Sequence, residues 1–172
     1  MNIFVTSKCP IESADNLCNK RTIKMILESA QMLSTAIRLT LDSSLYDDKI
    51  LYKATHQNHP CSLWVRESYE NFIWLCRHAK QMNKNYRSIS GKDHKSMDII
   101  HYCERLSGRI NYSIITPFTN CTKDFKNEIN VHDAYKKQMC KKWSEDKTPP
   151  KFTYSGKTPE FWSNYLEELE IQ

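Results

Sequence analysis

The chain has 172 residues and a formal net charge of +5 at pH 7, a length that suits one well-filled core and is short for two. We therefore expect a single domain over residues 1–172. The 25 basic and 20 acidic residues are so nearly balanced that the net charge alone does not indicate a nucleic-acid partner, and only the distribution of charges could do so.

Glycine, cysteine and apolar content narrow the class of protein. The chain has three glycines and few consecutive β-branched residues, and several segments repeat apolar residues at helical spacing, which predicts an all-α fold. Its seven cysteines include no C-x-x-C pair and are typical of free thiols in a reducing compartment. Because it has neither a signal-peptide pattern nor a run of 18 apolar residues, we expect a soluble cytoplasmic protein without a membrane segment.

The amino-terminal half contains the strongest helical pattern. Residues 1–6, MNIFVT, predict either one short buried strand or an extended tail pinned to the core. Pro10 then starts a short helix. From Lys20 to Arg38, apolar residues cover well over half of a helix circumference, so we predict that this helix runs through the centre of a helical bundle.

A narrow polar strip remains on the central helix. Its members stack one turn above another: Lys20, Lys24, Glu28, Gln31 and Thr35. Polar groups on a mostly buried helix need partners. Either Lys24 and Glu28 form an i,i+4 pair that reaches solvent, or the strip lines a pocket.

A second polar stripe is predicted on the next helix. After an irregular loop over 42–58, His59-Pro60 begins a helix that we expect to run to about Met82. Beside its apolar face lie four side chains at helical spacing: Glu67, Asn71, Trp74 and His78. Such groups either stack on and hydrogen-bond a planar ligand or cap a neighbouring helix.

A polar loop over 83–92, which contains Arg87, precedes a third helix. Asp93 is a suitable N-cap for a helix that starts at His94-Lys95-Ser96. Free backbone N–H groups and the helix dipole make such a start suitable for a phosphate, although the same residues also suit plain solvent exposure. Further on we expect a helix over 131–143, a surface linker over 148–157 and a last helix from Thr158.

Several common chemistries are excluded by their motifs. The chain lacks G-x-x-x-x-G-K-[ST], G-x-G-x-x-G and H-E-x-x-H, so P-loop nucleotide hydrolysis is ruled out. His56 and His59 lie close to Cys61, but His59 is followed by a proline and no second cysteine pair stands at metal spacing. We therefore expect no metal and no cofactor, and Cys61 is either a buried structural thiol or a nucleophile at a helix start.

The polar groups together suggest a cationic cleft for a phosphate-bearing ligand with a planar base. Glu28 is the candidate catalytic acid or base. The candidate substrate- and phosphate-binding residues are Lys20, Lys24, Gln31, His56, His59, Arg66, Asn71, Trp74, Arg87, His94, Lys95 and Ser96. This hypothesis requires the helix starts at His59 and His94 to point toward the central polar strip.

Several separated motifs resemble a known family. They are Asn19-Lys20-Arg21, Lys24 to Leu33, Asn58-His59-Pro60-Cys61, Trp64-Val65-Arg66 and His94-Lys95-Ser96. In this order they are similar to small proteins of tailed phages and large DNA viruses that are labelled as relatives of the pyrimidine-dimer DNA glycosylases. The resemblance extends from Met1 to about Trp143 and implies a small, basic, all-α enzyme.

The resemblance has a departure at the amino terminus. Those glycosylases use the amino group of a threonine that is exposed when the initiator methionine is removed, with an arginine after it. This chain instead begins Met1-Asn2-Ile3. The resemblance therefore assigns no catalytic residue here, and Glu28 is nominated from its helix position alone.

Two classes of function follow as expectations. The first is a virus-encoded enzyme that acts on DNA bases or nucleotides in the host cytoplasm during infection, with DNA glycosylase as the leading reaction. The alternative is a noncatalytic protein that binds a nucleotide or a host protein, for example to counter a host defence.

Overall fold

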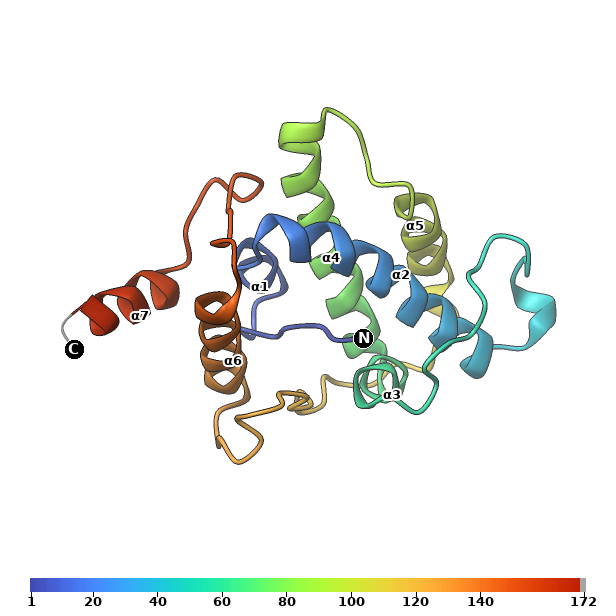
Figure 1. Ribbon diagram of the computed structural model, residues 1–172. Coiled ribbons are helices and arrows are strands. Elements are labelled where there is room, and N and C mark those ends of the chain that lie inside the picture. The colour runs from blue at the N-terminus through green and yellow to red at the C-terminus, as the bar shows by residue number, and fades with distance from the viewer. Residues whose placement is uncertain (171–172) are drawn as a thin grey trace.

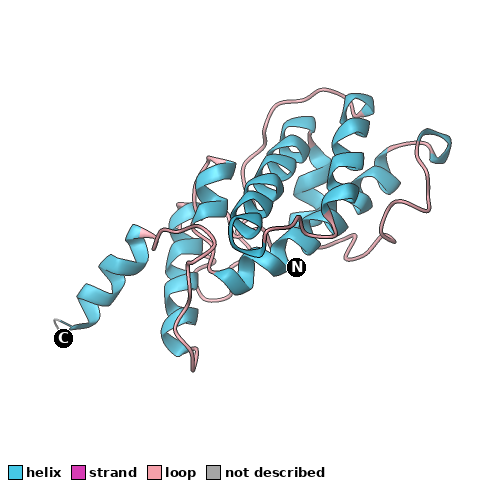
Figure 2. Cartoon of the chain, turned by 90° about the horizontal axis from the view of Figure 1, so that it is seen from above, coloured by secondary structure: helices cyan, strands magenta, loops and turns pink. Residues whose placement is uncertain are grey.

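The computed structural model describes residues 1–170 and confirms the predicted all-α fold (Figure 1). In chain order the α-helices are α1 Pro10–Asp15, α2 Asn19–Thr40, α3 Pro60–Glu67, α4 Tyr69–Ser90, α5 Met97–Leu106, α6 Val131–Glu145 and α7 Glu160–Glu170. Two short 3-10 helices, Ser43–Leu45 and Ser107–Arg109, lie in the connections. Figure 2 shows helices and loops, and residues 1–170 contain no strand.

Helix α2 lies in the middle of the bundle, as its apolar pattern predicts. It packs against α3, α4 and α5, and Figure 1 shows it crossing the centre of the molecule. Ile26, Leu33 and Ile37 are completely buried. Ile23, which the periodicity also assigns to the apolar face, is instead 38% exposed, because the neighbouring Thr22 takes the buried position and donates its hydroxyl to the Cys18 carbonyl.

The helix predicted from His59 to Met82 is broken into α3 and α4. Ser68 has an extended backbone, and its hydroxyl accepts a hydrogen bond from the Asn71 N–H. Serine is favoured at such an N-cap because it satisfies one of the free N–H groups of the helix start. The break turns α3 relative to α4, and this turn sets the direction of the helix start at His59.

The end of α4 and the start of α5 also differ from the prediction. Helix α4 continues through the predicted loop to Ser90 and ends at Gly91, whose φ of 70° favours glycine. Asp93 does not cap α5, because its carboxylate accepts a hydrogen bond from Asn83. Helix α5 begins at Met97 after Ser96, so His94 and Lys95 lie before the helix.

The amino-terminal segment is an extended tail, the second of the two predicted alternatives. Ile3 and Val5 are buried in the core. Further along, two side chains of the second polar stripe bind backbone carbonyls at the start of α1 and just before it. Trp74 donates its indole N–H to the Lys8 carbonyl at 2.7 Å, and His78 Nδ1 lies 2.9 Å from the Pro10 carbonyl. These residues therefore hold α1 against α4.

The carboxyl-terminal part is arranged around Trp143 near the end of α6. Phe152, Phe161 and Trp162 lie with their ring centroids 5.3 to 6.0 Å from the Trp143 ring. Figure 1 shows α7 extending away from the bundle beyond α6. None of the described helices has the length and apolarity required to cross a membrane.

Leu33→Ala tests the central position of α2. Leu33 is fully buried, so we expect the free energy of unfolding to fall by about 2 to 5 kcal/mol in chemical denaturation. Leu39→Ala on the same helix is the matched control, because Leu39 is 44% exposed and the change should cost less than about 1 kcal/mol. Equal losses in both variants would contradict a central α2.

His78 predicts a pH dependence of stability. Burial lowers the pKa of His78 to about 4, against the opposing hydrogen bond with the Pro10 carbonyl. The unfolded chain, with a histidine pKa of about 6.5, binds the proton more readily, so stability contributed by neutral His78 is complete above pH 6.5 and is lost as the pH falls toward 4. The loss should be on the order of 3 kcal/mol.

The measurement is the free energy of unfolding between pH 7.5 and pH 4, compared with His78→Asn. Asparagine retains a donor for the Pro10 carbonyl and does not titrate in this range. The wild-type protein should lose more stability than the variant over this interval. Parallel curves would show that His78 is not the responsible group.

Candidate active site

Glu28 lies in the middle of α2 with its carboxylate close to the amino terminus of the chain. Its side chain is 12% exposed. The Asn2 backbone N–H donates to Glu28 Oε2 at 3.0 Å, and the Met1 ammonium nitrogen lies 3.9 Å from the same oxygen. On the other side, Lys24 Nζ lies 3.5 Å from Oε1. The buried carboxylate is therefore satisfied by two cations and a backbone donor, which offset its loss of hydration.

The extended tail fixes these amino-terminal groups in position. Asn2 Oδ1 accepts hydrogen bonds from the Ile3 and Phe4 N–H groups. This turn gives Phe4 a φ of 58°, a left-handed conformation that is rare for a bulky residue and is often found at functional sites. The guanidinium of Arg21 lies 4.3 Å above the Phe4 ring and stabilises this conformation by a cation–π contact.

The first residue is held as well. The Met1 side chain is 2% exposed, and its sulfur accepts a hydrogen bond from Ser62 Oγ on α3 at 3.4 Å. Burial of this side chain directs the terminal ammonium toward α2 rather than into solvent. The amino terminus is thus part of the packed structure.

His59 at the start of α3 belongs to the same cluster. Its Nδ1 accepts a hydrogen bond from the Cys61 N–H at 3.2 Å and caps α3. Burial lowers the pKa of His59, and the Met1 ammonium and His56 lower it further, while Glu28 opposes them. His59 is therefore neutral at pH 7, next to the cationic amino terminus.

Two cysteines from distant parts of the chain also meet here. Cys61 Sγ donates to Cys121 Sγ at 3.6 Å. This contact lowers the pKa of Cys121 to about 7 and raises the pKa of the buried Cys61. The backbone N–H of Cys121 donates to the Tyr135 hydroxyl on α6. Cys121 lies in a segment without periodicity, so the sequence pattern does not indicate this pairing.

A cavity of about 520 Å³ opens beside the amino terminus. It lies between the extended tail, α2, α6 and the loop before α6. Its lining contains Asn2, Phe4, Arg21, Cys121, Thr122, Lys123, Asp124, Gln138, Met139, Lys141, Lys142 and Glu145. Its volume is within the range of small-molecule sites, and its lining includes Asn2, whose N–H binds Glu28.

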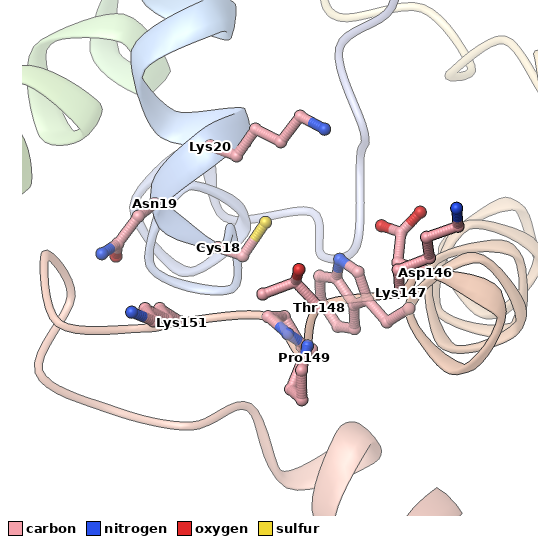
Figure 3. Close-up of a pocket in the computed structure, with 10 residues that line it drawn as sticks. Cys18, Asn19, Lys20, Asp146, Lys147, Thr148, Pro149 and Lys151 are labelled. Carbon is pink, nitrogen blue, oxygen red and sulfur yellow. The ribbon is translucent and has the colours of Figure 1, made fainter.

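A second cavity of about 370 Å³ lies near the start of α2, between α2 and the end of α6. Figure 3 shows Lys20 on α2, Asp146 and Lys147 after α6, and Lys151 on the following crossing. Three of these four charged side chains are lysines. Lys24 lies one turn after Lys20 on α2, and Lys141 and Lys142 on α6 line the first cavity, where Lys141 pairs with Asp124. We call these six lysines on α2, α6 and the following crossing the basic face.

The structure brings together only part of the predicted cleft. Lys24, Glu28, His56 and His59 belong to one electrostatic cluster. Gln31 lies less than one turn after Glu28 and is partly exposed. Arg66 donates to the Gln57 carbonyl.

The other predicted residues have structural partners elsewhere. Asn71 is buried and donates to the Trp64 carbonyl, and Trp74 lies in the core, stacked on His78. Arg87 forms an ion pair with Asp93.

The helix start at His94 is separate from that at His59. His94 receives no hydrogen bond from the Glu28 cluster, and its own N–H donates to Asn83 at 2.8 Å. Burial and Lys95 lower its pKa, whereas His59 responds to the Met1 ammonium and Glu28. Ser96 is buried and its hydroxyl lies 3.1 Å from the Tyr52 hydroxyl.

Comparison with known proteins identifies one family. A family model described as pyrimidine dimer DNA glycosylase matches residues 1–98, which is more than half of the chain. The matched segment contains the extended tail, Glu28 and His59, and it ends just after the start of α5. Searches of curated proteins and of solved structures gave no match.

Proposed function

We propose a reaction for this chain from one premise: the chain belongs to the pyrimidine dimer DNA glycosylase family. The chain removes a damaged pyrimidine base from DNA, with the α-amine at its amino terminus as the nucleophile and Glu28 as the group that handles the proton. The single observation that carries this proposal is the position of the Met1 ammonium and the Asn2 N–H on the Glu28 carboxylate.

The first residues of this chain differ from the threonine and arginine of the family, but the proposed reaction needs only an amine beside Glu28. The Met1 nitrogen lies 3.9 Å from Glu28 Oε2, and the Asn2 nitrogen lies 3.0 Å from it. Removal of Met1 would convert the Asn2 nitrogen into the α-amine without moving it away from Glu28. An amine is therefore next to the same carboxylate in either form of the chain.

The chemistry requires a neutral amine close to a proton acceptor. The amine nitrogen forms a bond to C1′ of the damaged nucleotide, the glycosidic bond breaks, and the base leaves with the electron pair and takes up a proton. The sugar ring then opens to give an imine between C1′ and the chain. Elimination of the 3′ phosphate from this imine cuts the DNA strand, and water hydrolyses the C1′–N bond and frees the chain. The ionised Glu28 carboxylate stabilises the positive charge that develops at C1′ as the base departs, and it accepts the amine proton once the nitrogen has bonded to C1′.

The substrate base has to leave the duplex to reach this amine. Enzymes that act on a base rotate the nucleotide out of the stack into a pocket. The 520 Å³ cavity beside Asn2 has a suitable size for such a base. The basic face beside the cavity provides lysines for the DNA phosphates, which supply most of the affinity of a protein for DNA.

The alternative function, a noncatalytic protein that binds a nucleotide or a host protein, predicts different behaviour from an enzyme. The same basic face would also attract a free nucleotide or an acidic protein. Such a binder, however, would form no covalent bond to an aldehyde of the sugar and would need no carboxylate at the amino terminus. Covalent trapping and loss of turnover on substitution of Glu28 therefore distinguish the enzyme from the binder.

Glu28→Gln tests the catalytic role. Glutamine retains an acceptor for the Asn2 N–H but cannot take up the proton, so we expect cleavage of the glycosidic bond in ultraviolet-irradiated duplex DNA, measured as strand breaks after alkali treatment, to fall by about 10² to 10⁴-fold. DNA affinity should change by no more than a few fold. Glu70→Gln on α4 is the control and should retain full turnover, and thermal unfolding should show that both variants fold.

Borohydride trapping identifies the nucleophile. Reduction during turnover should give a covalent protein–DNA adduct, and mass analysis of the digested adduct should place it on the amino-terminal residue. A variant extended by two residues before Met1 should give no adduct, because its amine is displaced from Glu28. An adduct on a lysine side chain would overturn the assignment, and no adduct together with no cleavage of the glycosidic bond would favour the binder.

The salt dependence of DNA binding tests the basic face. Lys24→Ala and Lys142→Ala should each reduce the slope of log affinity against log salt by about 1, because each removes one phosphate contact. Lys84→Ala is the control, since Lys84 is exposed on α4 and lines neither of the two cavities. Affinity that does not change with salt would argue against DNA phosphates as the ligand.

A further inference from the structure

Three metal-ligating side chains gather beside the amino terminus. They are His59, Cys61 and Cys121, and their ligand atoms all lie within 4.8 Å of one another. His59 and Cys61 flank the first residue of α3, and Cys121 comes from the loop before α6. From this geometry we propose that these residues bind a zinc ion, with a fourth coordination position open. The proposal does not depend on the glycosylase reaction.

The distance between the two sulfurs supports a metal more than a disulfide. Sulfurs about 2.3 Å from a tetrahedral zinc lie about 3.8 Å apart, and Cys61 Sγ and Cys121 Sγ lie 3.6 Å apart. A disulfide would need a separation of about 2.05 Å. The present arrangement of the thiols therefore needs little change to accept the ion.

The chemistry of the three ligands favours zinc in particular. Two thiolates and one imidazole match the borderline-soft character of this ion and the ligand sets of known zinc sites. Three protein ligands with an open position are the arrangement of a catalytic or exchangeable site, whereas structural sites have four. Cys61 is 2% exposed and Cys121 is half-buried, so the ion could enter from the side of Cys121.

His59 would change its hydrogen bond on binding. Its Nδ1 now accepts from the Cys61 N–H. If the imidazole binds zinc through Nε2, its proton must lie on Nδ1, which can then no longer accept a hydrogen bond. If it binds zinc through Nδ1, the lone pair that accepts from the Cys61 N–H is used for the metal. Either mode gives up the capping bond of α3, and zinc binding therefore couples to the first turn of this helix.

The surroundings hold the cluster in place. The Cys121 N–H donates to the Tyr135 hydroxyl, and this hydroxyl donates in turn to the Thr119 carbonyl. Asn2 Oδ1 lies 3.9 Å from Cys61 Sγ. A zinc ion here would join two segments, the start of α3 and the loop before α6, next to Asn2 of the amino-terminal tail.

The test is a titration of the reduced full-length protein with Zn²⁺ in competition with a chromophoric chelator, and with Co²⁺ as a spectroscopic probe. We expect one equivalent of zinc, and for cobalt the thiolate charge-transfer and intense visible bands of a tetrahedral site. Cys61→Ser and Cys121→Ser should each weaken zinc binding by more than about 100-fold, since even changes around the ligands cost about 10- to 100-fold.

Two further variants make the result specific. His59→Asn removes the imidazole but keeps a favourable N-cap for α3, and it should weaken zinc binding while helix content is unchanged. Cys9→Ser removes an exposed thiol outside the cluster and should bind zinc like the wild type. Undiminished binding in Cys121→Ser, a cobalt spectrum without thiolate bands, or no binding by protein whose thiols are fully reduced would each overturn the proposal. These measurements use no DNA, so failure of the zinc proposal and failure of the glycosylase proposal can be distinguished.

Discussion

The hydrogen bond from the Asn2 N–H to the Glu28 carboxylate is the contact on which the rest of the site depends. A carboxylate in the middle of a central helix loses most of its hydration, and only nearby donors and cations make this tolerable. The extended tail supplies them, because burial of Ile3 and Val5 fixes the chain direction. Packing of the tail in the core of the bundle therefore also positions the amino-terminal groups on Glu28.

The need to place the Asn2 N–H on Glu28 explains why Phe4 has a backbone conformation that aromatic residues rarely adopt. Phe4 has a positive φ, a costly choice for an aromatic residue. Arg21 lies over its ring, and Asn2 bonds to two following N–H groups. Local contacts thus stabilise a turn that an isolated peptide would rarely adopt.

The spacing of apolar residues predicted the position of the central helix but not where the helices end. The central position of α2 and the presence of Glu28 on its polar strip followed from apolar spacing. The break at Ser68 did not, because the apolar repeat continues across it and only the capping hydrogen bond marks the boundary. The meeting of Cys61 and Cys121 was also beyond reach, since Cys121 lies in an irregular loop and its position is set by tertiary contacts alone.

The two predicted phosphate-binding helix starts show the same limit. His59 and His94 have similar local sequences, each with a polar cap and neighbouring donors. Their neighbours in space differ, because the first faces the amino terminus and the second binds Asn83. Local chemistry predicted which groups could bind an anion, but the packing of α3 and α5 around α2 decides which of them share a site.

The double role of Ser68 has a consequence for how this site can change in evolution. One residue ends α3 and caps α4, so the junction has no spare length. A residue inserted or deleted there would change both the direction and the position of α3 relative to α4, and the side chains at the start of α3 would point to a different part of the bundle. Loops such as 42–58 can vary in length, whereas the spacing between α3 and α4 should remain fixed wherever the amino-terminal cluster is used.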